Sequence, residues 1–149
     1  MKTRLIGVVG CGARKREVPA PAKDLYTSRN FKLHREFVEA FTDDWFILSA
    51  KHGVLSPNAV TAPYDTSLYD LSPEKWKKWE SQVRADLRTL YSGQLVIFLS
   101  VAPAAYSAVL SEFPTVRLTR GLGIIRQGIV LRKLLLARQP QTRKRTSLL

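Results

Sequence analysis

The chain has 149 residues, 45% of them hydrophobic, which is long and apolar enough for one domain with its own core. Its formal net charge is +12, and nine Arg and Lys residues but no Asp or Glu follow Glu112, so a polyanion, most commonly nucleic acid, is the natural partner. The single cysteine, Cys11, excludes an internal disulfide and a zinc site built from thiolates.

One cysteine is also compatible with a reducing compartment, so we expect a cytoplasmic protein. The apolar run near the N-terminus is too short for a signal peptide or a membrane span, and we expect no membrane partner. Residues 139–149, which include Arg143, Lys144 and Arg145, show no core pattern and are expected to form a basic, disordered tail. A tail of this kind either contacts nucleic acid or only keeps the protein soluble.

The first predicted element is a buried strand at residues 4–9, which are apolar and β-branched and precede a turn at Gly10, Cys11 and Gly12. The two glycines would let backbone amides approach a ligand, and Lys15 would add positive charge. The spacing is not that of a dinucleotide or P-loop fingerprint. Cys11 is explained equally well as a small buried residue and as a ligand contact.

A helix is predicted after Asn30, which can cap it, because apolar residues recur at helical spacing from Phe31 to Phe41. His34 falls on the apolar stripe, where a hydrogen-bonded core histidine is expected. Tyr26 and Ser28 precede the helix, whose free N-terminal amides favour a polar or anionic ligand atom.

The second predicted strand, at residues 45–49, ends in Ser49 and is followed by a loop with several ionisable groups. Polar groups at the end of an apolar strand are where α/β proteins usually build a site. The loop residues that concern us are Lys51, His52, Gly53, Tyr64 and Asp65. Lys51 and His52 could instead be a solvated strand end, and Asp65 could only form an Asx-turn.

The rest of the chain is expected to alternate helices and strands. Ser72 and Pro73 begin a long helix whose Trp76 and Trp79 are core anchors by default, with stacking on nucleobases as the alternative. A strand at 94–100, a short helix at 103–113, a strand at 115–118 and a helix at 124–137 follow. Gly121 and Gly123 form the turn into that last helix, whose expected apolar stripe contains Ile124, Ile125, Gly128, Leu131, Leu134 and Leu135.

This order predicts an α/β fold, a three-layer α/β/α sandwich around a mostly parallel four-stranded sheet, with residues 1–138 as a single domain. Because the strands run parallel, the turns after Cys11, Ser49 and Ser100 and the turn at Gly121 should meet at one edge and form a pocket there.

Four segments carry a resemblance: CGARK, DLYTSRNFKLHR, WFILSAKHGVLSPNAVTAPYDTSL and GLGIIRQGIVL. Together they resemble a small family of uncharacterised bacterial, archaeal and phage proteins that is distantly related to the peroxide stress protein YaaA. YaaA-like chains carry a similar LSxxYGLLxP...PY block. The Cys, Lys and Tyr-x-Ser arrangement also resembles the base-handling domain of archaeosine synthase. The resemblance implies DNA binding and a role near nucleobase modification, although this chain lacks the inserted segment with which YaaA-type proteins grip DNA.

We therefore expect a nucleic-acid-associated protein, with DNA preferred over RNA, that has a nucleobase or nucleotide pocket and acts at a base or its N-glycosidic bond. Asp65 would stabilise a positively charged sugar, Lys51 would contact phosphate or act as a nucleophile, and His52 would transfer a proton. Tyr26 or Tyr64 would stack on the base. The predicted substrate-binding residues are Cys11, Gly12, Lys15, Tyr26, Ser28, Arg35, Ser49, Gly53, Tyr64, Gly121, Gly123 and Arg126. The predicted contacts to the nucleic-acid backbone are Arg132, Lys133, Arg138, Arg143, Lys144 and Arg145.

Two alternatives stay open. The protein could bind DNA or RNA without catalysis, or it could hydrolyse small nucleotides, in which case the basic tail is irrelevant. One acid beside a histidine is too few for a metal site, so neither a metal nor another cofactor is expected. The sequence leaves the oligomeric state open.

Overall fold

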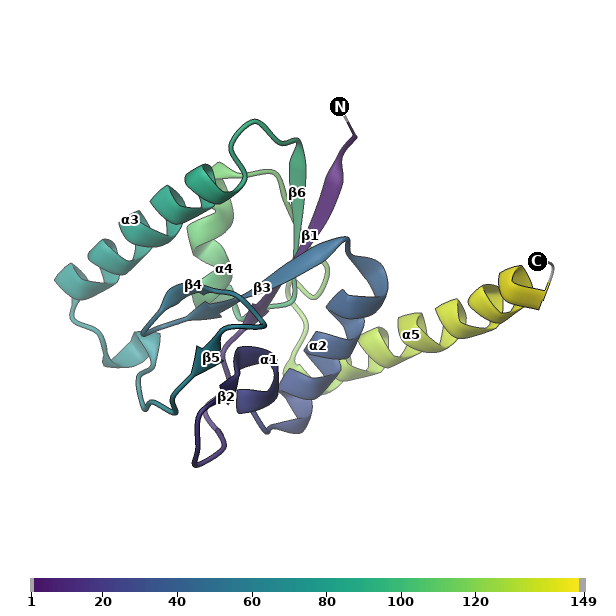
Figure 1. Ribbon diagram of the computed structural model, residues 1–149, viewed down its shortest axis with the longest axis horizontal. Helices are drawn as coiled ribbons and strands as arrows, with labels where there is room; N and C mark the ends of the chain where they lie inside the picture. The colour runs from purple at the N-terminus through teal and green to yellow at the C-terminus, as the bar shows by residue number, and fades with distance from the viewer. Residues whose placement is uncertain (1, 148–149) are drawn as a thin grey trace.

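The computed structural model describes the backbone of residues 2–147 and the side chains of residues 2–138. Figure 1 shows a mixed α/β fold from which the last helix projects. Its strands are β1 (Arg4–Gly10), β2 (Ala20–Pro21), β3 (Asp44–Ser49), β4 (Gly53–Leu55), β5 (Val60–Thr61), β6 (Val96–Ser100) and β7 (Thr115–Arg117). Its helices are α1 (Ala22–Leu25), α2 (Arg29–Phe41), η1 (Leu68–Asp70), α3 (Pro73–Leu90), α4 (Ala104–Ser107), η2 (Ala108–Glu112) and α5 (Ile124–Ser147).

The main sheet has five strands in the order β4-β3-β1-β6-β7, instead of the four that the sequence predicts. All neighbours pair in parallel except β3 and β4, which form an antiparallel hairpin. The additional strand is β4. Residues 50–52 form the turn between β3 and β4, and Gly53, which pairs with Ser49, begins β4 with a φ of 68° that residues with a side chain rarely adopt. The sequence predicts a turn at Gly53 but a loop after it.

Two buried clusters hold the sheet between helices. Phe46 and Leu48 of β3 belong to a cluster with α3, α4 and η2, whereas Trp45 and Ile47 belong to a second cluster with α1, α2 and α5. This alternation follows from the two-residue period of a strand. Because both faces of the central strands are covered, the interior residues of β1, β3 and β6 are apolar, and the polar residues of these strands, Arg4, Asp44, Ser49 and Ser100, lie at their ends.

Helix α2 passes close to the backbone of Gly7 in β1. A Cβ atom at this position would lie 2.6 Å from Val38 Cβ and 3.1 Å from Thr42 Oγ1. Atoms do not approach that closely, so glycine is required where α2 crosses β1.

The two long helices begin at serine caps. Ser28 Oγ accepts a hydrogen bond from Phe31 N at the start of α2, so Ser28 is the cap and the expectation that Asn30 caps this helix is wrong. Ser72 Oγ accepts from Lys75 N, with Pro73 in the first turn of α3, as predicted.

The closing helix α5 differs most from expectation. Leu131 and Leu135 are buried, but Ile124, Ile125 and Leu134 are exposed and do not belong to the packed stripe. The sequence predicts a disordered tail from residue 139, whereas the backbone of α5 continues as a helix to Ser147. The side chains of residues 139–149, with Arg143, Lys144 and Arg145, lie outside the described part of the chain, and their contact with nucleic acid stays a prediction.

Candidate functional site

A chain of hydrogen bonds links three elements at the carboxyl edge of the sheet. The hydroxyls of Tyr26 and Tyr64 lie 2.5 Å apart, and Ser49 Oγ donates to Tyr64 at 2.7 Å. Tyr26 follows α1, Ser49 ends β3, and Tyr64 lies in the loop after β5. The structure therefore brings together three of the predicted site residues from segments that are distant in sequence.

Ser49 is the anchor of this cluster. Its Oγ accepts hydrogen bonds from the backbone N–H groups of Lys51 and His52, at 3.3 and 3.0 Å. Its backbone carbonyl accepts from Trp79 Nε1 at 2.8 Å. Ser49 is completely buried, so its polar atoms are used to fix the loop and Tyr64.

The ring of Tyr64 is surrounded by positive and aromatic groups. Lys15 Nζ lies 4.3 Å from the ring centroid and Lys51 Nζ lies 6.0 Å from it. His52 packs edge-on against the same ring, with 5.2 Å between centroids. Tyr64 is half-buried whereas Tyr26 is almost completely buried, so Tyr64 is the ring that a ligand can reach.

The environment keeps these phenols neutral at physiological pH. Burial raises the pKa of Tyr26 to about 12. The pKa of Tyr64 is raised as well, by burial first and then by the neighbouring Cys11. Partial burial, followed by the charge of Lys51, lowers the pKa of His52, which favours a neutral imidazole. Two neutral phenols and a neutral imidazole can donate or accept hydrogen bonds without carrying charge.

Cys11 lies near Tyr64 and contacts a third tyrosine, Tyr106. Its thiol donates to the Tyr106 hydroxyl at 3.6 Å, and that hydroxyl also accepts from Leu68 N at 3.4 Å. Burial raises the pKa of Tyr106 as well. Tyr106 is not among the residues predicted from the sequence, and Trp79 is the buried core anchor that the sequence favours, with its Nε1 bonded to Ser49. Tyr106 lies at the start of a helix directly after β6, and that position is the one signal that could have identified it.

Several other predicted residues have a structural role. Gly12 is near Ser28, whose Oγ would lie 3.6 Å from a Cβ atom placed on Gly12. Arg35 donates to Asp24 at 2.9 Å and to Glu39 at 2.8 Å. Burial lowers the pKa of Arg35, but the hydrogen bonds and charges of the two carboxylates together outweigh it, so that the pKa is raised. Arg35 thus connects α1 to α2.

Asp65 is exposed next to Tyr64, and it makes no hydrogen bond or ion pair with the residues that the structure describes. Its carboxylate is therefore available to a ligand, but nothing in the fold orients it. If Asp65 stabilises charge on a substrate, contacts with the bound substrate must orient its carboxylate.

The remaining predicted residues lie around α5. Gly121 has a φ of 78°. A Cβ atom placed on Gly121 or on Gly123 would have no neighbouring atom within 4 Å, so both glycines lie in open space. Arg126, Arg132 and Lys133 are exposed on the helix. Arg138 lies over the Phe41 ring, 5.0 Å from its centroid.

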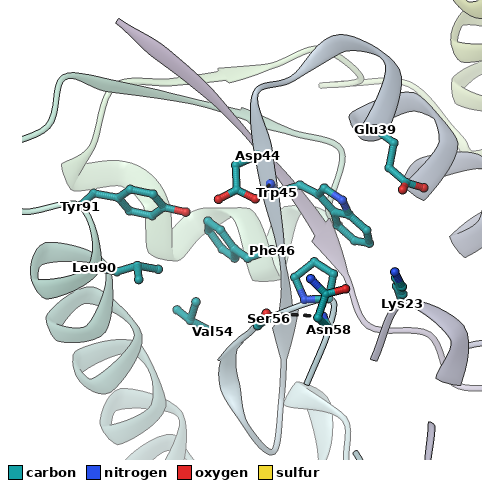
Figure 2. A pocket seen from close by; sticks show the side chains of 11 residues that line it. Lys23, Glu39, Asp44, Trp45, Phe46, Val54, Ser56, Asn58, Leu90 and Tyr91 are labelled. Atoms are coloured by element: carbon teal, nitrogen blue, oxygen red, sulfur yellow. Dashed lines mark hydrogen bonds between the residues drawn. The ribbon is translucent and has the colours of Figure 1, made fainter. Parts of the chain in front are cut away.

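A cavity of about 610 Å³ lies elsewhere, beside the amino-terminal half of β3. Figure 2 shows Asp44, Trp45 and Phe46 along that strand, with Leu90 and Tyr91 on one side and Lys23 and Glu39 on the other. None of the catalytic, substrate-binding or nucleic-acid-binding residues predicted from the sequence lines this cavity. It forms because β4 pairs only with the last three residues of β3, Ile47 to Ser49.

Neither a metal-binding group nor a membrane span is found in the described part of the chain. No three His, Cys, Asp or Glu side chains are close enough there to hold a metal ion. No described helix combines the length and the apolar character that crossing a membrane requires.

Comparison with known proteins identifies a family and one relative. The model of a family of unknown function (DUF6884) matches residues 6–128, a range that includes Cys11, Ser49, Tyr64 and Arg126. The uncharacterized protein YfjM of Bacillus subtilis (strain 168) is 34% identical over 74 residues, which are 45% of this chain and 49% of YfjM. The chain thus spans about half the length of this curated relative. No solved structure matches it, and the distant relationship to YaaA stays a prediction.

Proposed function

We propose that this chain, which belongs to the DUF6884 family of unknown function, is a nucleic-acid-associated protein that receives a nucleobase or nucleotide at the carboxyl edge of its sheet. The observation that carries the proposal is the Tyr64 ring. Tyr26 and Ser49 fix its hydroxyl, and Lys15 and Lys51 lie over the ring.

A nucleotide fits the chemistry of this cluster because it combines a flat base with an anionic phosphate. Stacking of a base on an exposed aromatic ring is worth about 1–3 kcal/mol and tolerates any sequence. The ammonium of Lys15 lies where a base would stack, 4.3 Å from the centroid. A bound nucleotide would therefore displace the ammonium from the ring, and the nucleotide's own phosphate would pair with it.

The fold and the sequence resemblance support the same proposal. The two buried clusters support a three-layer sandwich, in which ligands bind at the carboxyl ends of the strands. The resemblance to YaaA-like proteins, and the net charge of +12, support DNA as the partner.

The test uses single-stranded 20-mer DNA with one 2-aminopurine, whose fluorescence falls when it stacks on an aromatic ring. We expect Tyr64→Phe to keep the quenching and Tyr64→Leu to lose it, with binding weakened roughly 5- to 150-fold, the equivalent of about 1–3 kcal/mol. Lys15→Ala should weaken binding and lower its salt dependence. The matched control is Lys77→Ala, an exposed lysine on α3. Equal quenching by wild type and Tyr64→Leu would contradict the proposal.

Catalysis at the N-glycosidic bond rests on Asp65, the exposed acid next to Tyr64. Its carboxylate would stabilise the positive charge that develops on the sugar when the bond breaks. Incubation with modified and unmodified DNA and nucleotides, followed by mass spectrometry, should show a released base that Asp65→Asn fails to produce. Binding without any product would instead identify the alternative, a DNA- or RNA-binding protein without catalysis.

A further inference from the structure

A second candidate binding surface lies between the start of α2 and the start of α5. A hollow of about 280 Å³ opens there, and its apolar lining consists of Leu33, Ile124, Ile125 and Ile129. Arg29 and Arg132 also line it. None of its lining residues belongs to the Tyr64 cluster, so this is a separate surface that we call the isoleucine hollow.

The apolar residues of the isoleucine hollow are unusually exposed. All three isoleucines belong to α5, and Ile124 is 72% exposed, Ile125 81% and Ile129 46%. Leu131 and Leu135 already anchor α5 to the rest of the fold, so the isoleucines form a second apolar face that the domain leaves uncovered. Burying one such side chain is worth about 1.5–3 kcal/mol, and contiguous exposed apolar residues commonly mark interaction sites.

The charges around the hollow have a single sign. Arg29 and Arg132 line it, Arg126 is exposed nearby in sequence, and no Asp or Glu is among the lining residues. Within the described residues, neither Arg29 nor Arg132 forms an ion pair. The occupant that complements this surface therefore carries negative charge next to an aliphatic group.

We propose that the isoleucine hollow docks an acidic segment of another protein, which inserts an aliphatic side chain between α2 and α5 and places carboxylates on Arg29 and Arg132. A second copy of this chain fits poorly because its own end is equally basic. Nucleic acid would pair with the arginines but would leave the isoleucines without an apolar partner. An acidic, aliphatic segment satisfies both features at once.

The test begins with a yeast-displayed library of random 16-residue peptides, sorted for binding to the full chain and counter-sorted against Ile125→Asp. Because Ile125 is 81% exposed, this substitution should not disturb folding, which circular dichroism verifies. The enriched peptides should combine Leu, Ile or Val with flanking Asp or Glu. Failure to enrich any peptide, or enrichment without this combination, overturns the proposal.

The best enriched peptide is then synthesised with a fluorescent label and titrated by anisotropy. We expect Ile125→Asp and Arg132→Glu each to weaken binding about tenfold or more, and Lys77→Glu on α3 to change it less than about twofold. Tyr64→Leu should leave peptide binding unchanged, which separates this proposal from the nucleotide site. Displacement of the peptide by the 20-mer DNA, together with weaker direct binding of that DNA to Ile125→Asp than to wild type, would assign the hollow to nucleic acid and overturn the proposal.

Discussion

At the scale of single residues, two buried side chains, those of Ser49 and Trp79, fix the position of the more exposed residues of the candidate site. Trp79 Nε1 donates a hydrogen bond to the Ser49 carbonyl. Ser49 Oγ donates to Tyr64 and accepts from the backbone N–H groups of Lys51 and His52. Lys51 and His52 are exposed, and Tyr64 is half-buried. The contacts to Lys51 and His52 are local in sequence, whereas Tyr64 and Trp79 lie 15 and 30 residues away from Ser49. Both oxygen atoms of Ser49 have partners, which fixes the direction in which Tyr64 presents its ring.

His34 provides a residue-scale prediction about pH. It is 5% exposed, its Nε2 has no hydrogen-bond partner, and burial lowers its pKa from 6.5 to about 4. The expectation that this core histidine is hydrogen-bonded does not hold at Nε2. His34 binds a proton near pH 6.5 in the unfolded chain but only near pH 4 in the folded protein. The contribution of His34 to the free energy of unfolding is therefore fully present above pH 6.5 and is lost as the pH falls from 6.5 to 4.

The loss attributable to His34 should reach about 3 kcal/mol, at roughly 1.4 kcal/mol per pH unit. His34→Leu should remove this part of the pH dependence, because it has a similar volume and no proton to bind. Urea unfolding of wild type and His34→Leu at pH 7.5 and pH 4.5 measures the difference. Parallel losses in the two proteins would show that His34 does not cause it.

At the scale of elements, the crossing of α2 over β1 depends on Gly7. We predict that Gly7→Ala destabilises the protein by about 3 kcal/mol, because the new methyl group would overlap Val38 Cβ at 2.6 Å. Gly123→Ala is the matched control, since nothing lies within 4 Å of its built Cβ, and it should change stability by less than about 0.5 kcal/mol. Thermal unfolding measures both.

A second substitution tests the cause of the effect. The loss in the Gly7→Ala/Val38→Ala double variant should be smaller than the sum of the two single losses, because Val38→Ala removes Val38 Cγ1, which would lie 2.7 Å from the new methyl group, although Val38 Cβ at 2.6 Å remains. An additive loss in the double variant would mean that the two positions are not in contact, and the close approach of α2 to β1 would then not explain the glycine.

At the scale of the whole molecule, the unequal distribution of charge determines how binding responds to salt. We predict that removal of residues 139–149 lowers the slope of log K against log salt for single-stranded DNA by about 2, since it removes Arg143, Lys144 and Arg145. The matched control replaces Lys75, Lys77 and Lys78 by Gln, which removes an equal charge from α3. If the slope decreases more in this control than in the truncated protein, the phosphate contacts lie on α3 and the tail only keeps the protein soluble.

The sequence by itself determined the α/β class, the apolar strands, most of the long helices and the residue types of the candidate site, because these depend on periodicity and on local turn and cap chemistry. Only the tertiary structure decided how those residues are used. It added β4 to the sheet, buried Tyr26 and Ser49, connected Ser49 to Trp79 and left Ile124 and Ile125 exposed. The physical reason is that burial and long-range hydrogen bonds depend on which distant segments pack together, and no local pattern specifies the partner of a side chain.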